Sequence, residues 1–442
     1  MRLRFALTCS LPVPPPTARP KLVGLGSAAL DFLAVVAAFP RPDAKLRTLS
    51  TTTQGGGNAA NCLTAASRLG LASALWSKLG GDGNAEVIAS ELAADGVDAS
   101  LCARGSAGSP SPFTYIIVDQ SSSTRTCIHT PGEPATPGEL PPTTVKALLD
   151  GATVAVFDGR LAECGTLLAA AARAQGLTVV VEAERLRPGL DELLSLADVV
   201  VTSQHYPEAA TGETELGAGL VELAFRLPHA RLLVQTLGAR GAIALERLAS
   251  DSSAPFCDAT ATLTDMEGVG TASAPEPAEV GALPVPSDTL MAAPGQFVRR
   301  PPVAAAAVVA AATAAAVANA DAGNAASYAP SSGQLSGSAL TARLLFTPPA
   351  VVAPNGMVDT TGAGDAFIGA LCFALAHAMD TAPALRLAAW VAAAKCRMLG
   401  ARAGLPRAAE VPPALLSGGE LSWVSQREEE SEEEVVGDSG NT

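Results

Sequence analysis

The chain contains Asp359-Thr360-Thr361-Gly362-Ala363-Gly364-Asp365-Ala366-Phe367, and apolar residues at helical spacing follow it. Backbone amides of small residues at the start of a helix form a site for phosphate or for developing negative charge. A carboxylate beside that site can accept the proton of an attacking hydroxyl group. The combination predicts phosphoryl transfer to an alcohol. The alternative is a surface helix that is capped after a glycine-rich turn.

This segment resembles the second signature of the ribokinase-like (pfkB-type) carbohydrate kinases, Asp-Thr-x-Gly-Ala-Gly-Asp. Their first signature is similar to Gly55-Gly56-Gly57-Asn58-Ala59-Ala60-Asn61, which leads into a helical pattern at 63–69. The resemblance covers roughly 21–247 and 344–412. Gly57-Asn58 and Asp158-Gly159-Arg160 are most similar to the ketohexokinase-like members. The resemblance implies that Asp365 is the catalytic base and that the amides of Gly362, Ala363 and Gly364 form the anion hole.

The same resemblance implies the residues that contact the substrates. The sugar-contacting residues would be Asp31, Gly57, Asn58 and Asn61, and the adenine nucleotide would lie against Thr236, Gly238, Gly241 and Gly404. Separately from the resemblance, Arg125 in Thr124-Arg125-Thr126 is a candidate for a phosphate contact. Each residue type also has a simpler reading. The two asparagines are common as helix caps, the glycines as turns, and an arginine as a charge on an edge strand. His129 is more typical of a structural or surface histidine than of a catalyst.

The resemblance also implies ATP and Mg²⁺ as cofactors, and a monovalent cation such as K⁺ near Asp359. We expect a structural role for Asp359 itself, because its position suits the capping of a turn. Many family members carry Asn-x-x-Glu after the fourth strand, whereas this chain has Ser203-Gln204-His205-Tyr206-Pro207-Glu208 there. Glu208 is either a substitute or an acid at a helix start. The metal ligands are therefore not predicted.

Short β-branched runs separated by helix-length segments predict a doubly wound, mostly parallel α/β sheet flanked by helices. The predicted strands are 154–157, 178–181, 199–202 and 232–236, and the helical patterns between them include 167–174 and 190–196. A hairpin of 113–118 and 125–129 lies outside this rhythm and predicts a small β-sheet lid. Residues 22–29 nearly match a dinucleotide fingerprint, but the prolines at 40 and 42 leave little room for the long helix and second strand that a Rossmann dehydrogenase requires.

The chain of 442 residues divides by composition. We expect a disordered leader or transit peptide at 1–20, a kinase domain at 21–249 and 342–415, and an insert rich in Ala, Pro, Ser and Thr at 250–341. The insert would expand the turn between strands 241–247 and 344–346, and its Ala-rich stretch 303–320 predicts a marginal helix and not a membrane span. An acidic disordered tail would follow at 416–442.

The formal charge of −14 argues against a nucleic-acid ligand. Eight scattered cysteines without Cys-x-x-Cys fit a reducing compartment. The sequence therefore predicts an ATP-dependent sugar kinase acting on a ketose-like or pentose sugar, with no membrane partner. A nucleoside kinase and a non-catalytic scaffold are the alternatives. We expect a cytoplasmic protein, or a plastid protein if the N-terminus is a transit peptide. The family resemblance also allows a homodimer formed through the lid.

Overall fold

The computed structural model describes residues 19–122, 124–249, 259, 261–263, 265–266, 290–291, 295–297, 340–350 and 356–418. The predicted leader up to residue 18, most of the predicted insert and the tail from residue 419 lie outside the described residues. Within the described part, no helix is both long enough and apolar enough to cross a membrane.

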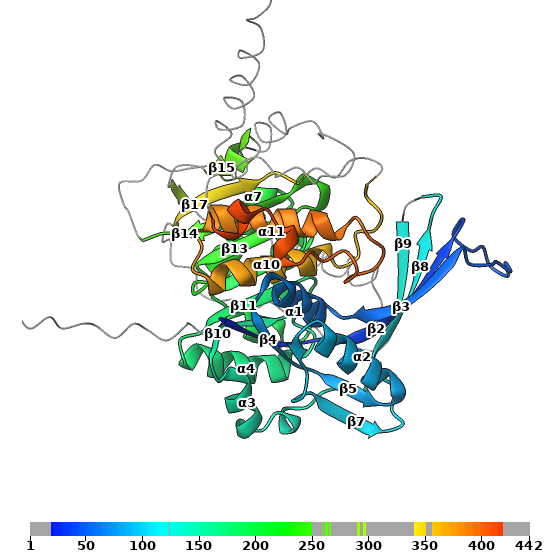
Figure 1. Ribbon diagram of the computed structural model, residues 1–442. Helices are drawn as coiled ribbons and strands as arrows, with labels where there is room; N and C mark the ends of the chain where they lie inside the picture. The colour runs from blue at the N-terminus through cyan, green and yellow to red at the C-terminus, as the bar shows by residue number, and fades with distance from the viewer. Residues whose placement is uncertain are drawn as a thin grey trace, which may run out of the picture.

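The described residues contain one large sheet of eleven strands, which runs in the order β15-β17-β14-β13-β12-β11-β10-β1-β4-β6, with β16 also paired to β17 (Figure 1). The parallel part consists of β6 (Val97–Asp98), β4 (Ala72–Trp76), β1 (Lys21–Leu25), β10 (Ala152–Phe157), β11 (Thr178–Ala183), β12 (Val199–Thr202) and β13 (Leu232–Thr236). The antiparallel part consists of β14 (Ala242–Arg247), β17 (Leu340–Thr347), β15 (Leu290–Met291) and β16 (Gly295–Phe297). β14 and β17 pair as the predicted flanks of an expanded hairpin.

Helices cover both faces of this sheet because its central strands are apolar on both sides. In β10, Val154 and Val156 join one core with α1 (Asn58–Leu69), α2 (Gly83–Ala94), α10 (Ala363–Ala376), α11 (Thr381–Lys395) and α12 (Pro413–Leu416). Ala155 and Phe157 join the other core with α3 (Pro142–Leu149), α4 (Ala162–Ala174), α5 (Leu190–Leu194), α6 (Tyr206–Thr211) and α7 (Leu216–Arg226). Single 3₁₀ turns occur at η1 (Pro137–Glu139), η2 (Gly238–Arg240) and η3 (Ala408–Glu410). The predicted doubly wound α/β fold is confirmed.

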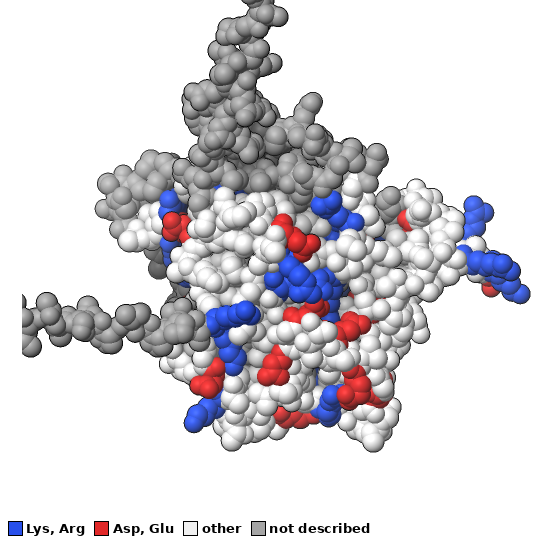
Figure 2. All heavy atoms as spheres, viewed as in Figure 1, with Lys and Arg blue, Asp and Glu red and all other residues white. Residues whose placement is uncertain are grey.

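Two smaller sheets complete the described structure. The predicted lid is a four-stranded sheet in the order β3 (Ser50–Gly56), β2 (Ala29–Val36), β8 (Phe113–Asp119) and β9 (Thr124–Thr130), and it projects from one side of the large sheet (Figure 1). β5 (Lys78–Gly81) and β7 (Ala103–Ala107) form a separate pair. On the face shown in Figure 2, basic and acidic side chains are intermixed along the main body.

The parallel strands direct their carboxyl ends to the same edge of the large sheet. Loops after β10, β11 and β13 therefore meet there, and ligands in open α/β sheets bind at this edge. The two glycine-rich signatures lie at the N-terminal ends of α1 and α10, and these two helices pack directly against each other.

Candidate active site

Asp365 lies in the first turn of α10, and the helix begins with a turn that only glycine fits easily. The N-cap residue Gly362 has φ +76°, and a Cβ atom there would lie 2.9 Å from the side chain of Ala401. The amide of Ala363 donates a hydrogen bond to the Thr360 carbonyl at 3.2 Å. The amides of Gly362 and Gly364 donate to no other group of the described residues, as expected at a helix start. These two amides are therefore the better candidates for an anion hole, and Ala363 contributes by closing the turn.

A chain of hydrogen bonds holds the Asp365 carboxylate in place. Asn61 Nδ2 on α1 donates to Asp365 Oδ2 at 2.8 Å, and Arg402 Nε donates to Asn61 Oδ1 at 2.9 Å. Arg402 Nη2 in turn donates to the Gly56 carbonyl at 3.0 Å. The guanidinium fixes which end of the Asn61 amide faces the carboxylate. The sequence reasoning missed Arg402, since it stands in an irregular segment outside both signatures.

The charge state of Asp365 follows from its burial. Its side chain is only 8% exposed, and burial raises the pKa of this carboxyl group to about 7. The hydrogen bond from Asn61 and the charge of Arg160 lower the pKa, whereas the negative charges of Glu184 and Asp158 raise it. A carboxyl group of this kind is suited to accept a proton near neutral pH.

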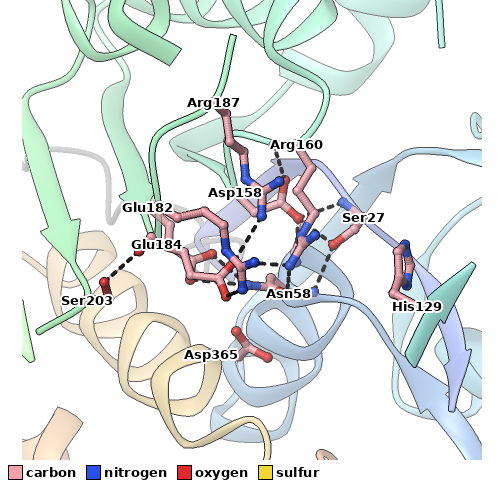
Figure 3. A network of polar contacts seen from close by, with 12 residues as sticks. Ser27, Asn58, His129, Asp158, Arg160, Glu182, Glu184, Arg187, Ser203 and Asp365 are labelled. Carbon is pink, nitrogen blue, oxygen red and sulfur yellow. Dashed lines mark hydrogen bonds and ion pairs between the residues drawn. The ribbon is translucent and has the colours of Figure 1, made fainter. Parts of the chain in front are cut away.

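Asn58 points into the same region and does not cap its helix. The N-cap of α1 is Gly57, which has φ +93°, and no side chain caps this helix start. Asn58 Nδ2 instead lies 3.2 and 3.3 Å from the two carboxylate oxygens of Glu182, and its Oδ1 accepts from Arg160 at 3.4 Å (Figure 3). The capping alternative for Asn58 and Asn61 is therefore wrong.

Glu182 and Glu184 at the end of β11 are the site residues that sequence reasoning overlooked. Burial and the charges of Asp365 and Asp158 raise the pKa of Glu182 well above its usual range. Glu184 carries three arginine contacts, at 3.1 Å to Arg160, 2.9 Å to Arg185 and 3.1 Å to Arg187. These positive charges hold the pKa of Glu184 below its usual range although burial opposes them. Acids at the carboxyl end of the predicted strand 178–181 were the available signal.

Asp158 after β10 organises the start of α1. Its Oδ2 accepts from the Ser27 amide at 2.7 Å, from Ser27 Oγ at 2.6 Å and from the Ala59 amide at 3.2 Å. Its neighbour Arg160 forms the ion pair with Glu184. The Asp158-Gly159-Arg160 segment is thus bound to the protein itself, and it supports the loop that carries Asn58.

The lid places a polar row on the face that carries Arg125. Asp31 on β2 is paired with Thr114 on β8, which is paired with His129 on β9, and Thr114 Oγ1 lies 3.2 Å from His129 Nδ1. Burial raises the pKa of Asp31 to about 6, although Thr114 hydrogen-bonds to its carboxylate. A Cβ at Gly56 would lie 2.2 Å from the Asp31 carboxylate, so glycine lets this side chain approach the first signature.

Arg125 connects the lid to the loop before α10. Its Nη1 donates to Thr360 Oγ1 at 2.6 Å, and the side chain is otherwise exposed. Because Thr360 precedes the Gly362 turn, this arginine lies beside the candidate anion hole, and its contact with a phosphate stays a prediction.

The predicted nucleotide residues lie on two different segments. Thr236 ends β13, and its Oγ1 donates to the Thr202 carbonyl at 3.2 Å. Gly238 follows with φ +59° at the start of η2. A Cβ atom at Gly241 would lie 2.2 Å from the Thr347 carbonyl oxygen, so only glycine fits there. A Cβ atom at Gly404 would likewise lie 2.3 Å from the Lys395 carbonyl oxygen. Close backbone packing accounts for Gly241 and Gly404, which leaves Thr236 and Gly238 as the open nucleotide candidates.

The segment that departs from the Asn-x-x-Glu pattern forms α6. Glu208 is exposed in the first turn of that helix. Among the described residues, no group of three or more His, Cys, Asp and Glu side chains could hold a metal ion by itself.

The fold thus places a buried carboxylate, and two amides that have no acceptor among the described residues, at one helix start beside a β-sheet lid. The family model of the pfkB family carbohydrate kinases matches residues 19–270 and 343–408. The chain belongs to this family.

Solved structures agree with the fold. A ribokinase of Arabidopsis thaliana complexed with ribose and ATP is 17% identical, with a TM-score of 0.58 over 90% of this chain and 99% of that chain. A nucleoside kinase of Methanocaldococcus jannaschii is 16% identical, with a TM-score of 0.56 over 90% of this chain and 98% of that chain. Phosphofructokinase-2 of Escherichia coli in complex with potassium is 17% identical, with a TM-score of 0.55 over 89% of this chain and 97% of that chain. At these identities the likeness shows the fold alone.

Proposed function

We propose that this protein transfers the γ-phosphate of ATP to a hydroxyl group of a ketose-like or pentose sugar. The observation that carries the proposal is the position of Asp365, a buried carboxylate that Asn61 holds beside the amides of Gly362 and Gly364, which have no acceptor among the described residues. A structural aspartate at a helix start would be more stable if it were solvated, or if it bonded to the amides of its own helix.

In this reaction Asp365 accepts the proton of the attacking hydroxyl as its oxygen bonds to the γ-phosphorus. The bond from that phosphorus to the bridging oxygen breaks, and ADP leaves. The amides of Gly362 and Gly364, together with Arg125, stabilise the negative charge on the transferred group. Asp31, Asn58 and Asn61 bind the sugar hydroxyls, with Gly57 allowing close approach of the backbone.

The nucleotide would lie along Thr236 and Gly238. Magnesium bound to the nucleotide phosphates would offset their negative charge. The described residues offer no group of three or more His, Cys, Asp and Glu side chains that could hold the ion without the nucleotide. The residues do not fit the monovalent cation that the family resemblance implies, because N–H and O–H donors occupy the oxygens of Asp359.

The lid presents a polar row that suits a sugar. Asp31, Thr114 and His129 form one polar row on the face on which Arg125 reaches Thr360. The next row on that face consists of Leu33, Ile116 and Cys127 and is less polar. The aromatic residues Phe32 and Tyr115 alternate with these rows and occupy the other face, with ring centroids 5.5 Å apart. The polar row suits the hydroxyl groups of a sugar or of the ribose of a nucleoside, and the apolar row beside it suits a nucleobase, so the substrate panel has to separate the two.

The outer face of the lid supports a homodimer. Tyr115 and Ile128 are directly opposite each other on β8 and β9 and are 52% and 53% exposed. Neighbouring apolar side chains that remain exposed on a sheet commonly mark an interaction surface. Sedimentation of the protein and of a Tyr115→Ser, Ile128→Ser variant would test this part of the proposal, since only the variant should sediment as a monomer.

The test of the proposed activity is ATP consumption against fructose, ribose, other ketoses and nucleosides. Asp365→Asn should abolish turnover, and Asp380→Asn, which changes an exposed aspartate at the start of α11, should leave it intact. Turnover on nucleosides alone would favour the nucleoside kinase. No turnover on any substrate, in protein shown to bind ATP, would favour the non-catalytic scaffold.

A further inference from the structure

Lys395 has the most deeply buried charged group near the active site. It is the last residue of α11 and is 0% exposed. Its Nζ donates to the backbone carbonyl of Asp359 at 2.7 Å. A buried ammonium group is costly unless hydrogen-bond acceptors and a negative charge surround it. Its position beside Asp359 therefore needs an explanation beyond packing.

Asp359 offers no oxygen that lacks a protein donor. Its Oδ1 accepts from the Thr361 amide at 2.9 Å and from Thr361 Oγ1 at 2.7 Å, and its Oδ2 accepts from the Gly400 amide at 2.7 Å. The carbonyl oxygen completes the set through Lys395. The lysine charge and these hydrogen bonds hold the pKa of Asp359 below its usual range although burial opposes them. The expected structural role of Asp359 agrees with this geometry.

A monovalent cation does not fit this arrangement. Such an ion requires several oxygen ligands around it, whereas the groups that face the Asp359 oxygens here are N–H and O–H donors. The fixed charge of Lys395, at hydrogen-bond distance from the carbonyl, would also repel an added cation. This misfit affects the loop that carries the candidate anion hole, since Asp359 begins the turn that ends at Gly362.

We propose that the ammonium group of Lys395 performs the work of that cation, so that the loop from Asp359 to Gly362 keeps its conformation without K⁺. Lys395 is then a positioning residue for the candidate anion hole. The Lys395 carbonyl also packs against Gly404, and the carbonyl of the next residue, Cys396, accepts hydrogen bonds from the amides of Val358 and Asp359. This inference rests on the proposed kinase function for its catalytic consequence, but the absence of a cation site can be tested without it.

The decisive experiment is equilibrium dialysis of the full chain with Tl⁺ as a probe for K⁺, combined with thermal denaturation in KCl and in choline chloride of equal ionic strength. Lys395→Met removes the charge, and Lys146→Met is the matched control because Lys146 is exposed on α3. The unmodified protein and the control should bind no stoichiometric Tl⁺, and they should melt at the same temperature in both salts. Lys395→Met should bind one Tl⁺ and should be stabilised by K⁺ alone.

Turnover supplies the second measurement where kinase activity is present. The unmodified protein should be equally active in both salts. Lys395→Met should turn over at least about tenfold faster in KCl than in choline chloride, because one charge-assisted hydrogen bond corresponds to about that factor. One bound Tl⁺ in the unmodified protein, or its activation by K⁺, would overturn the proposal even if Lys395→Met fails to fold. A folded Lys395→Met that stays indifferent to K⁺ would overturn it as well. If no substrate is phosphorylated, dialysis and melting still decide the question.

Discussion

Replacement of Asp365 by asparagine should stop the reaction and at the same time make the protein more stable. Burial raises the pKa of this carboxyl group from 3.8 to about 7 on folding, a rise of about 3 units. At 1.36 kcal/mol per unit, the ionised side chain destabilises the folded state by about 4 kcal/mol above pH 7. Part of this cost would pass to Glu182, whose pKa the Asp365 charge also raises. We therefore expect a net gain of about 2–3 kcal/mol, because asparagine still accepts the Asn61 hydrogen bond.

The sign of the pH dependence makes this prediction specific. The folded state binds the Asp365 proton more tightly than the unfolded state, so the cost is absent below pH 3.8, grows as the pH rises, and is complete above about pH 7. Urea denaturation of Asp365→Asn and the unmodified protein at pH 8 and pH 5 measures it, with Asp380→Asn as the control. The gain should be largest at pH 8 and smaller at pH 5, while turnover falls by about 10²–10⁴-fold. An asparagine variant that is less stable than the unmodified protein at pH 8 would refute the argument from burial.

Three further predictions concern the same site. In the unmodified protein, kcat/KM should rise about tenfold between pH 6 and pH 8 as Asp365 ionises, and a pH-rate profile that is flat in this range would contradict the assigned base. Arg402→Met should lower kcat about tenfold and destabilise the fold by a few kcal/mol, because it removes the donor to Asn61 and the donor to the Gly56 carbonyl; kinetics and urea denaturation measure both, and an unchanged kcat would argue against a positioning role. Arg125→Ala should raise the KM for ATP and change stability by less than about 1 kcal/mol, since the side chain is exposed, and a large loss of stability would show a structural role instead.

The regular part of the fold could be predicted from the sequence because its strands are buried on both sides. The predicted strands 199–202 and 232–236 have the same bounds as β12 and β13. The lid hairpin was also predicted, since two short strand patterns lie on either side of a linker of turn-forming residues. β2 and β3 were not predicted as strands of the lid, because β3 is rich in Thr and Gly and carries no apolar alternation. Their pairing depends on tertiary contacts that a local pattern does not contain.

The site could be predicted only where its residues follow one another along the chain. The two signatures identified Asp365 and Asn61 as candidates, but the hydrogen bond between these residues, which are 304 positions apart, appears only in the structure. Arg402 and Glu182 lie outside both signatures, and their roles appear only when α1, β11 and the segment after α11 meet. For Asn58 the local sequence was misleading. It favours a helix cap, whereas in the structure the Asn58 side chain donates to Glu182.

The alanine-rich, aromatic-poor composition is connected to the chemistry through the contact between α1 and α10. A Cβ at Gly369 would lie 2.5 Å from the Cys62 carbonyl and 2.7 Å from the Ala65 side chain, so the two helices touch almost backbone to backbone. This short separation is what lets Asn61, with only a short side chain, reach Asp365 at 2.8 Å. Larger residues on these helices would bury more apolar area but would hold the helices further apart. The small residues that looked like ordinary helix formers therefore determine whether the base can be positioned.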